Sequence, residues 1–150
     1  MSRNWLLVAA LTVTAFVPST WAGADLVLSL DSTAAVGGLV PIDVTFDNNF
    51  GLVAGWSLGV CHTEEVEIDN VAIGSTTATI QAGSPPDFES TVLWPSQGWS
   101  TGVVVDFQGM SPLPQGQGYQ LYVAEYSING APGDVATLTF CGDEFPLPVD

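Results

Sequence analysis

The chain has 150 residues, with 16 acidic residues against a single basic one, Arg3, and a formal net charge of −15. So acidic a surface repels phosphate backbones and anionic lipid, which disfavours nucleic acid and membrane surfaces as partners. Hydrophobic residues make up 47% of the chain and aromatic residues 10%, which argues against a disordered acidic tail and indicates one folded domain.

The N-terminus is typical of a secretory signal peptide. Arg3 precedes an apolar stretch over 5–17, and Ala22-Gly23-Ala24 provides an A-x-A cleavage site. The stretch is shorter than the roughly 18–20 apolar residues of a membrane anchor. We predict a signal peptide over 1–24, cleaved after Ala24 or alternatively after Ala22, with no membrane insertion afterwards. We expect a secreted protein, extracellular or at the cell surface, with one domain over 25–142 and a tail or the start of a linker over 143–150.

Alternation with a period of two dominates the rest of the chain. It is clearest where Val40, Ile42, Val44 and Phe46 alternate with polar residues. Turns rich in Gly, Pro and Ser separate further strand candidates at 26–30, 53–62, 65–73, 76–81, 91–94, 101–107, 120–128 and 135–141. We predict an all-β fold, namely a two-sheet antiparallel jelly-roll sandwich of about nine strands.

One short motif occurs twice, as Gly55-Trp56-Ser57-Leu58-Gly59-Val60 and as Gly98-Trp99-Ser100-Thr101-Gly102-Val103. Alternation places each Trp on one face of its strand and the small residues on the other. We predict that the two copies are central strands of one sheet, paired antiparallel, with each Trp turned inward. Their outer sides would form a flat strip that a partner surface could approach closely, with the candidate residues Ser57, Gly59, Ser100 and Gly102. The plainer alternative is two core tryptophans without a functional role.

Two cysteines follow the signal peptide, Cys61 and Cys141. Export to an oxidising compartment and the even count favour a disulfide between them, with two buried free thiols as the alternative. Closing so long a loop would stabilise the fold by about 4–5 kcal/mol in the chain-entropy model. Both cysteines share strand parity with polar residues, so we place the bridge on an outer face or at a strand end.

The sequence contains no recognisable catalytic pattern. His62 is the single histidine, and we interpret it as a surface or strand-end residue because no nucleophile motif accompanies it. No two carboxylates stand out as a pair, so we expect no enzyme, with a glycoside-acting enzyme as a remote alternative. Glu65, Glu67 and Asp69 share one face of a predicted strand, which indicates a solvated acidic face or a weak Ca²⁺ site; no other cofactor is expected.

The order of these motifs resembles that of cohesin-like modules of large bacterial secreted and surface proteins. The matching stretches read VGGLVPIDVTFDN over 36–48 and VAGWSLGV over 53–60, followed by a Leu-Pro-x-Gly turn at 113–116 and a closing strand. Cys61-His62 stands where cohesins usually carry Tyr-Asp. The resemblance covers about 26–141 and implies a jelly-roll sandwich, with its third and sixth strands side by side, that holds a partner without catalysis.

The leading hypothesis is therefore a secreted binding or structural module whose partner is an extracellular protein or matrix. The alternative is a carbohydrate-binding module, whose partner would be an extracellular polysaccharide. Such a module needs aromatic rings exposed in a planar row. Trp94, Tyr122 and Tyr126 are the candidates, because Tyr122 and Tyr126 share strand parity.

The acidic composition predicts that salt stabilises the folded domain. Added NaCl screens the repulsion between carboxylates, so Tm should rise with ionic strength. Thermal melts in NaCl and in millimolar CaCl₂ at equal ionic strength separate general screening from a specific site, since only a site gives Ca²⁺ an additional effect. A Tm that responds to neither salt would contradict both ideas.

Overall fold

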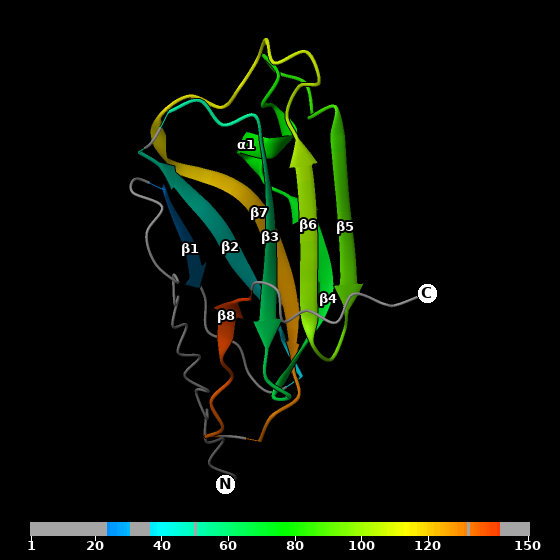
Figure 1. Cartoon of the computed structure of the whole chain (residues 1–150). Helices are drawn as coiled ribbons and strands as arrows, with labels where there is room; N and C mark the ends of the chain where they lie inside the picture. Colours follow the sequence, from blue (N-terminus) through cyan, green and yellow to red (C-terminus); the bar gives the residue numbers. More distant parts are fainter. Residues whose placement is uncertain (1–23, 31–36, 50, 132, 142–150) are drawn as a thin grey trace, which may run out of the picture.

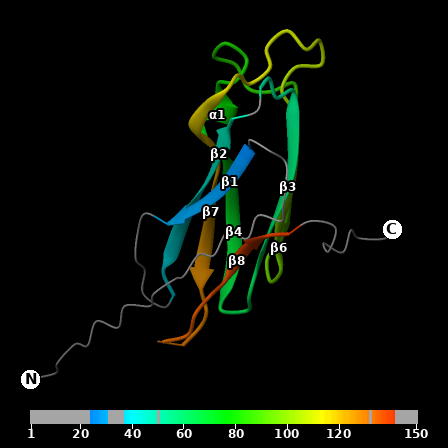
Figure 2. The same ribbon diagram turned by 60° about the vertical axis from the view of Figure 1, so that its left-hand side comes forward.

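A computed structural model describes residues 24–30, 37–49, 51–131 and 133–141. They form two four-stranded antiparallel sheets, which confirms the predicted all-β sandwich (Figures 1 and 2). The first sheet has the order β1-β2-β7-β4, with the strands Ala24–Leu30, Leu39–Asn48, Gly116–Ile128 and Val66–Ile73. The second has the order β5-β6-β3-β8, with the strands Phe88–Trp94, Gly98–Val104, Gly55–His62 and Leu138–Phe140.

The two predicted terminal segments lie outside the described residues. Of the expected signal peptide, only Ala24 is described, and it begins β1. The expected tail over 143–150 is not described at all.

Strand β2 follows the predicted alternation. Its inward residues Val40, Ile42 and Val44 are buried, whereas Pro41 between them is exposed. On one side β2 pairs with β1, and on the other with the long strand β7, with register shifts after Val44 and Phe46. Because β2 and β7 are the central strands of their sheet, their inward sides supply much of the core.

The described residues contain eight strands and one short helix, so the prediction of a strand over 76–81 was wrong. Helix α1 is a single turn over Ser75–Ala78. Its Thr77 is buried, and its hydroxyl donates a hydrogen bond of 2.8 Å to the carbonyl of Leu121 in β7. The intrinsic propensity of threonine favours strands. Here the conformation is decided by this tertiary contact and by the turn at Gly74, because the Gly74 amide also donates to the Leu121 carbonyl.

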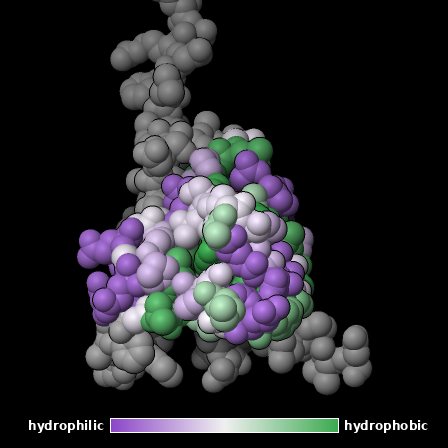
Figure 3. Space-filling model, turned by 90° about the horizontal axis from the view of Figure 1, so that it is seen from above, coloured by the Kyte–Doolittle hydropathy of each residue, from purple (hydrophilic) through white to green (hydrophobic). Residues whose placement is uncertain are grey.

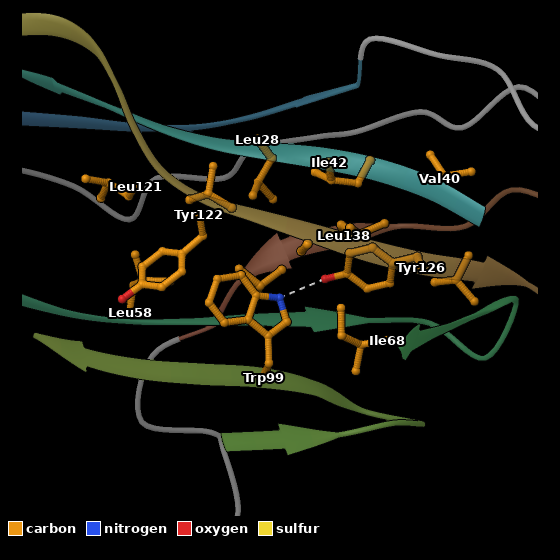
Figure 4. Packing of buried hydrophobic residues seen from close by; sticks show 14 of the residues in the cluster. Leu28, Val40, Ile42, Leu58, Ile68, Trp99, Leu121, Tyr122, Tyr126 and Leu138 are labelled. Atoms are coloured by element: carbon orange, nitrogen blue, oxygen red, sulfur yellow. Dashed lines mark hydrogen bonds between the residues drawn. The ribbon is translucent and has the colours of Figure 1, made fainter. Parts of the chain in front are cut away.

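Two hydrogen bonds join the sheets through the core. Trp99 of β6 donates from Nε1 to the hydroxyl of Tyr126 in β7 at 3.0 Å (Figure 4). The hydroxyls of Thr101 and Tyr122 lie 2.7 Å apart, and the rings of Trp99 and Tyr122 meet edge to face at 5.4 Å. Burial raises the pKa of both tyrosines above the ordinary value, so both stay neutral and able to donate.

The two tyrosines should contribute unequally to stability. In Tyr126→Phe the buried Trp99 Nε1–H loses its acceptor, which should cost about 1–3 kcal/mol of unfolding free energy. In Tyr122→Phe the Thr101 hydroxyl keeps a second partner, the Thr91 hydroxyl at 3.1 Å, so the cost should be smaller. Urea denaturation of both variants gives the comparison, and a larger loss in Tyr122→Phe would contradict the assignment.

Candidate functional site

The two GWSxGV copies form strands β3 and β6, which pair antiparallel at the centre of the second sheet, as predicted. Their register places Ser57 opposite Gly102 and Gly59 opposite Ser100. Residues that are directly opposite point to the same side of a sheet, so these four share the outer face. The pairing therefore brings together the candidate residues that the motif suggested.

The strip is only partly open to a partner. Ser57 is exposed, and a side chain carbon added at Gly102 would meet no atom within 4 Å. Gly59 is instead buried, and its carbonyl accepts a hydrogen bond of 3.0 Å from the amide of Cys141. Ser57, Ser100 and Gly102 are thus the accessible part of the predicted strip, and Gly59 is not.

Strand β5 extends this face with larger side chains. Its Ser90 lies opposite Gly102 and its Val92 opposite Ser100, while Phe88 lies opposite Val104. Phe88 is 47% exposed and Val92 45% exposed. The outer face thus combines a low strip of Ser and Gly on β3 and β6 with an apolar ridge on β5.

The described acidic residues avoid this face. None of the outward positions of β5, β6, β3 and β8 in the described chain carries a charge. Outward positions of the first sheet, in contrast, include the carboxylates of Asp43, Asp47, Glu67 and Glu125. The sandwich therefore has one acidic face and one uncharged face.

The predicted disulfide between Cys61 and Cys141 is confirmed, with the two Cα atoms 5.7 Å apart. It joins the end of β3 to the residue that follows β8, where Cys61 lies opposite Thr139. Both cysteines have outward parity, so the bridge lies on the outer side of the second sheet beside Gly59. It fastens a strand of only three residues, β8, to the sheet edge.

The predicted sugar-stacking row is wrong for Tyr122 and Tyr126. They do share a strand face, but that face points into the core, where the two residues are 0% and 2% exposed. Trp94 lies at the end of β5 on the opposite sheet, opposite Gly98, and is half-buried. The three rings therefore form no exposed planar row, which stacking on a polysaccharide requires.

The three calcium candidates do not come together as a site. A bulge between Ile68 and Asn70 breaks the alternation of β4, so Asp69 no longer continues the row of Glu67. Glu65 precedes the strand, and the Thr63 side chain hydrogen bond lowers the pKa of its carboxyl. Among the described residues, no three His, Cys, Asp or Glu side chains are grouped to hold a metal ion.

His62 is a strand-end residue with a structural contact. It ends β3 and is half-buried, and its ring meets that of Tyr126 edge to face at 5.5 Å. Its Nδ1 lies 3.0 Å from the carbonyl of Thr63. These contacts make it part of the packing around Tyr126.

A second exposed apolar group lies at one end of the sandwich, where Figure 3 shows hydrophobic patches among hydrophilic side chains. Phe107 and Met110, on the loop between β6 and β7, are 71% and 80% exposed. The loop is ordered by Asp106, whose carboxylate accepts from the amides of Gln108 and Met110, and by Asp87, which accepts from the Phe107 amide at 2.8 Å.

Sequence reasoning missed part of the face. The predicted strand began at residue 91, whereas β5 begins at Phe88. The alternation of Phe88, Ser90, Val92 and Trp94 could have revealed the full strand and its apolar ridge. The predicted strand over 101–107 included Phe107, but β6 ends at Val104, so Phe107 lies with Met110 in the loop that follows.

Comparison of the chain with protein families, with curated proteins and with solved structures finds no match. In the part of the chain that the structure describes, no helix has the length and apolar character to span a membrane. The functional argument therefore rests on the two faces and edges of the sandwich.

The disulfide should account for a large share of stability. It joins residues 80 positions apart, and a loop of this length corresponds to about 4 kcal/mol in the chain-entropy model. Reduction, or the double variant Cys61→Ala with Cys141→Ala, should lower the unfolding free energy by about that amount. Urea denaturation with and without a reductant measures the loss, and an unchanged midpoint would contradict it.

Proposed function

We propose that this chain is a secreted, non-catalytic binding module of the cohesin-like jelly-roll type, whose partner is an extracellular protein. The recognition surface is the outer face of the sheet β5-β6-β3-β8. Its centre is the strip of Ser57, Ser100 and Gly102, and its rim is the apolar ridge of Phe88 and Val92 on β5.

The observation that carries the proposal is that, among the described residues of so acidic a chain, none of the outward positions of this sheet is charged. A charged group costs free energy when an interface desolvates it, so the centres of protein interfaces are depleted in charged residues. The serine and glycine positions allow a partner's backbone or side chains to approach closely. The flanking Phe88 and Val92, both about half exposed, offer apolar contact area.

Two further features support a role outside the cell. The disulfide between Cys61 and Cys141 suits an oxidising compartment, and the N-terminal 24 residues have the composition of a signal peptide. The neighbouring positions of the third and sixth strands agree with what the cohesin-like resemblance implies.

A protein partner fits this surface better than a polysaccharide does. Sugar rings stack on exposed aromatic rings that lie in a plane. Phe88 and the half-buried Trp94 are the aromatic side chains on this face, at opposite ends of a strand of seven residues. They are about 20 Å apart at the usual rise of a strand, with Ser90 and Val92 between them.

The test is a long charged side chain in the middle of the strip. Ser57→Arg and Ser100→Arg should abolish partner binding, because each places a cation on the surface that the partner must cover. Ser127→Arg is the matched control, since Ser127 has outward parity on the first sheet. All three should fold, with unfolding free energies within about 1 kcal/mol of the parent.

Binding is measured by immobilising each variant and applying the extracellular proteins of the producing organism. The proposal expects proteins retained by the parent and by Ser127→Arg but lost from both strip variants. Equal retention by all four proteins would place recognition elsewhere. Retention of a polysaccharide on a glycan array would favour the alternative module.

A further inference from the structure

We propose that strand β5 is a self-association edge, which pairs antiparallel with β5 of a second copy of this chain around Thr91. The surface is the edge of the second sheet, not its outer face, so this inference is independent of the proposed recognition face. Figure 1 shows β5 at the border of its sheet, with β6 as its neighbour on the other side.

The edge at β5 has fewer of the features that protect sheet edges than β4 or β8. Proteins protect such edges with charged side chains, proline, bulges or very short strands. Edge strand β4 has a bulge and two carboxylates, Glu67 and Asp69, and edge strand β8 has only three residues. Strand β5 has seven residues, pairs with β6 without a register shift, contains no proline, and has Glu89 as its one charged residue.

The backbone of β5 presents free groups at alternate positions. The amides of His62 and Val105 bond across β3 and β6 to the carbonyls of Gln97 and Ala54, so the odd-numbered residues of β6 face β3. The even-numbered residues therefore face β5 and bond with Phe88, Ser90, Val92 and Trp94. The backbone groups of Glu89, Thr91 and Leu93 point to the open edge, where no described strand pairs with them.

The sequence of β5 is complementary to itself in this register. Antiparallel pairing about Thr91 places Thr91 opposite Thr91, Phe88 opposite Trp94 and Ser90 opposite Val92 of the second copy. Aromatic pairs and threonine pairs are favourable cross-strand neighbours. Leu93, which is 39% exposed, would lie opposite Glu89 and lose part of its exposed surface.

The same register keeps the charges apart. The two Glu89 side chains would be about 14 Å from one another, because each lies opposite Leu93, four positions along the strand. This distance exceeds the Debye length of about 8 Å at physiological ionic strength. The net charge of the chain still opposes association, so pairing should strengthen as salt is added. A single strand pair is a small interface, so the dimer should be weak and depend on concentration.

Sedimentation velocity of the mature chain over a wide concentration range, at low and high NaCl, tests the inference. Thr91→Pro removes the N–H that points to the open edge and leaves the hydrogen bonds between β5 and β6 intact. Because the dimer is two-fold symmetric, two hydrogen bonds between the copies are lost. The association constant should fall at least about tenfold. Thr91→Ala is the matched control: it also removes the side chain but keeps the N–H, and it should still associate.

A covalent trap gives an independent readout. The described chain has no free cysteine, so Thr91→Cys introduces a single thiol that would lie directly opposite its copy. The Cα separation of about 5.5 Å for such a pair lies within disulfide range. Under mild oxidation Thr91→Cys should form a covalent dimer faster than Ser127→Cys does.

Three outcomes would overturn the inference. One is a parent that stays monomeric at every concentration and salt level. Another is a Thr91→Pro variant that associates as strongly as Thr91→Ala, with near-ultraviolet circular dichroism showing that both are folded. The third is equal oxidation of the two cysteine variants. Loss of partner binding in Ser57→Arg would be unaffected by any of these results.

Discussion

The hydrogen bonds between β6 and β7 are the interaction on which the rest of the sandwich depends. Apolar side chains fix the offset of two sheets through the fit of their shapes, and a buried donor adds a directional constraint because it must keep its acceptor. The bond from Trp99 to Tyr126 and the contact of Thr101 with Tyr122 fix β6 over β7 at two points along the strands. Fixing these strands also fixes β3, which pairs with β6, and hence the outer strip.

The two outer faces of the sandwich differ in chemistry. On β6, Trp99 and Thr101 face the core, and the outward residues between and beside them, Gly98, Ser100 and Gly102, are small. On the first sheet, the outward positions of β2 include the carboxylates Asp43 and Asp47. The outer face of the first sheet therefore repels anionic surfaces, whereas the outer face of the second sheet can contact an uncharged partner surface.

The two edge strands of the second sheet, β8 and β5, differ in length and in how they are held. At one border the strand is short and is tied down by the bridge between Cys61 and Cys141. At the other, β5 has seven residues in regular register with β6, and it continues the same outer face with Phe88 and Val92. If β5 pairs with its copy, two outer faces join into one extended sheet, so a module with one recognition strip becomes bivalent. Bivalent engagement raises effective affinity without any new contact.

The sequence by itself determined most of the strands, the parity of the regular ones and the disulfide. A period of two identifies a strand and sorts its residues into two faces, which is why the GWSxGV strands were predictable. The pairing of Cys61 with Cys141 was predictable because export and an even cysteine count favour one disulfide. Only the tertiary structure decided which face meets the core. The shared parity of Tyr122 and Tyr126 fits an exposed row and a buried pair equally well, and the partner sheet selected the buried pair. The bulge of β4 and the helical turn around Thr77 likewise depend on contacts with β7, which is distant in sequence.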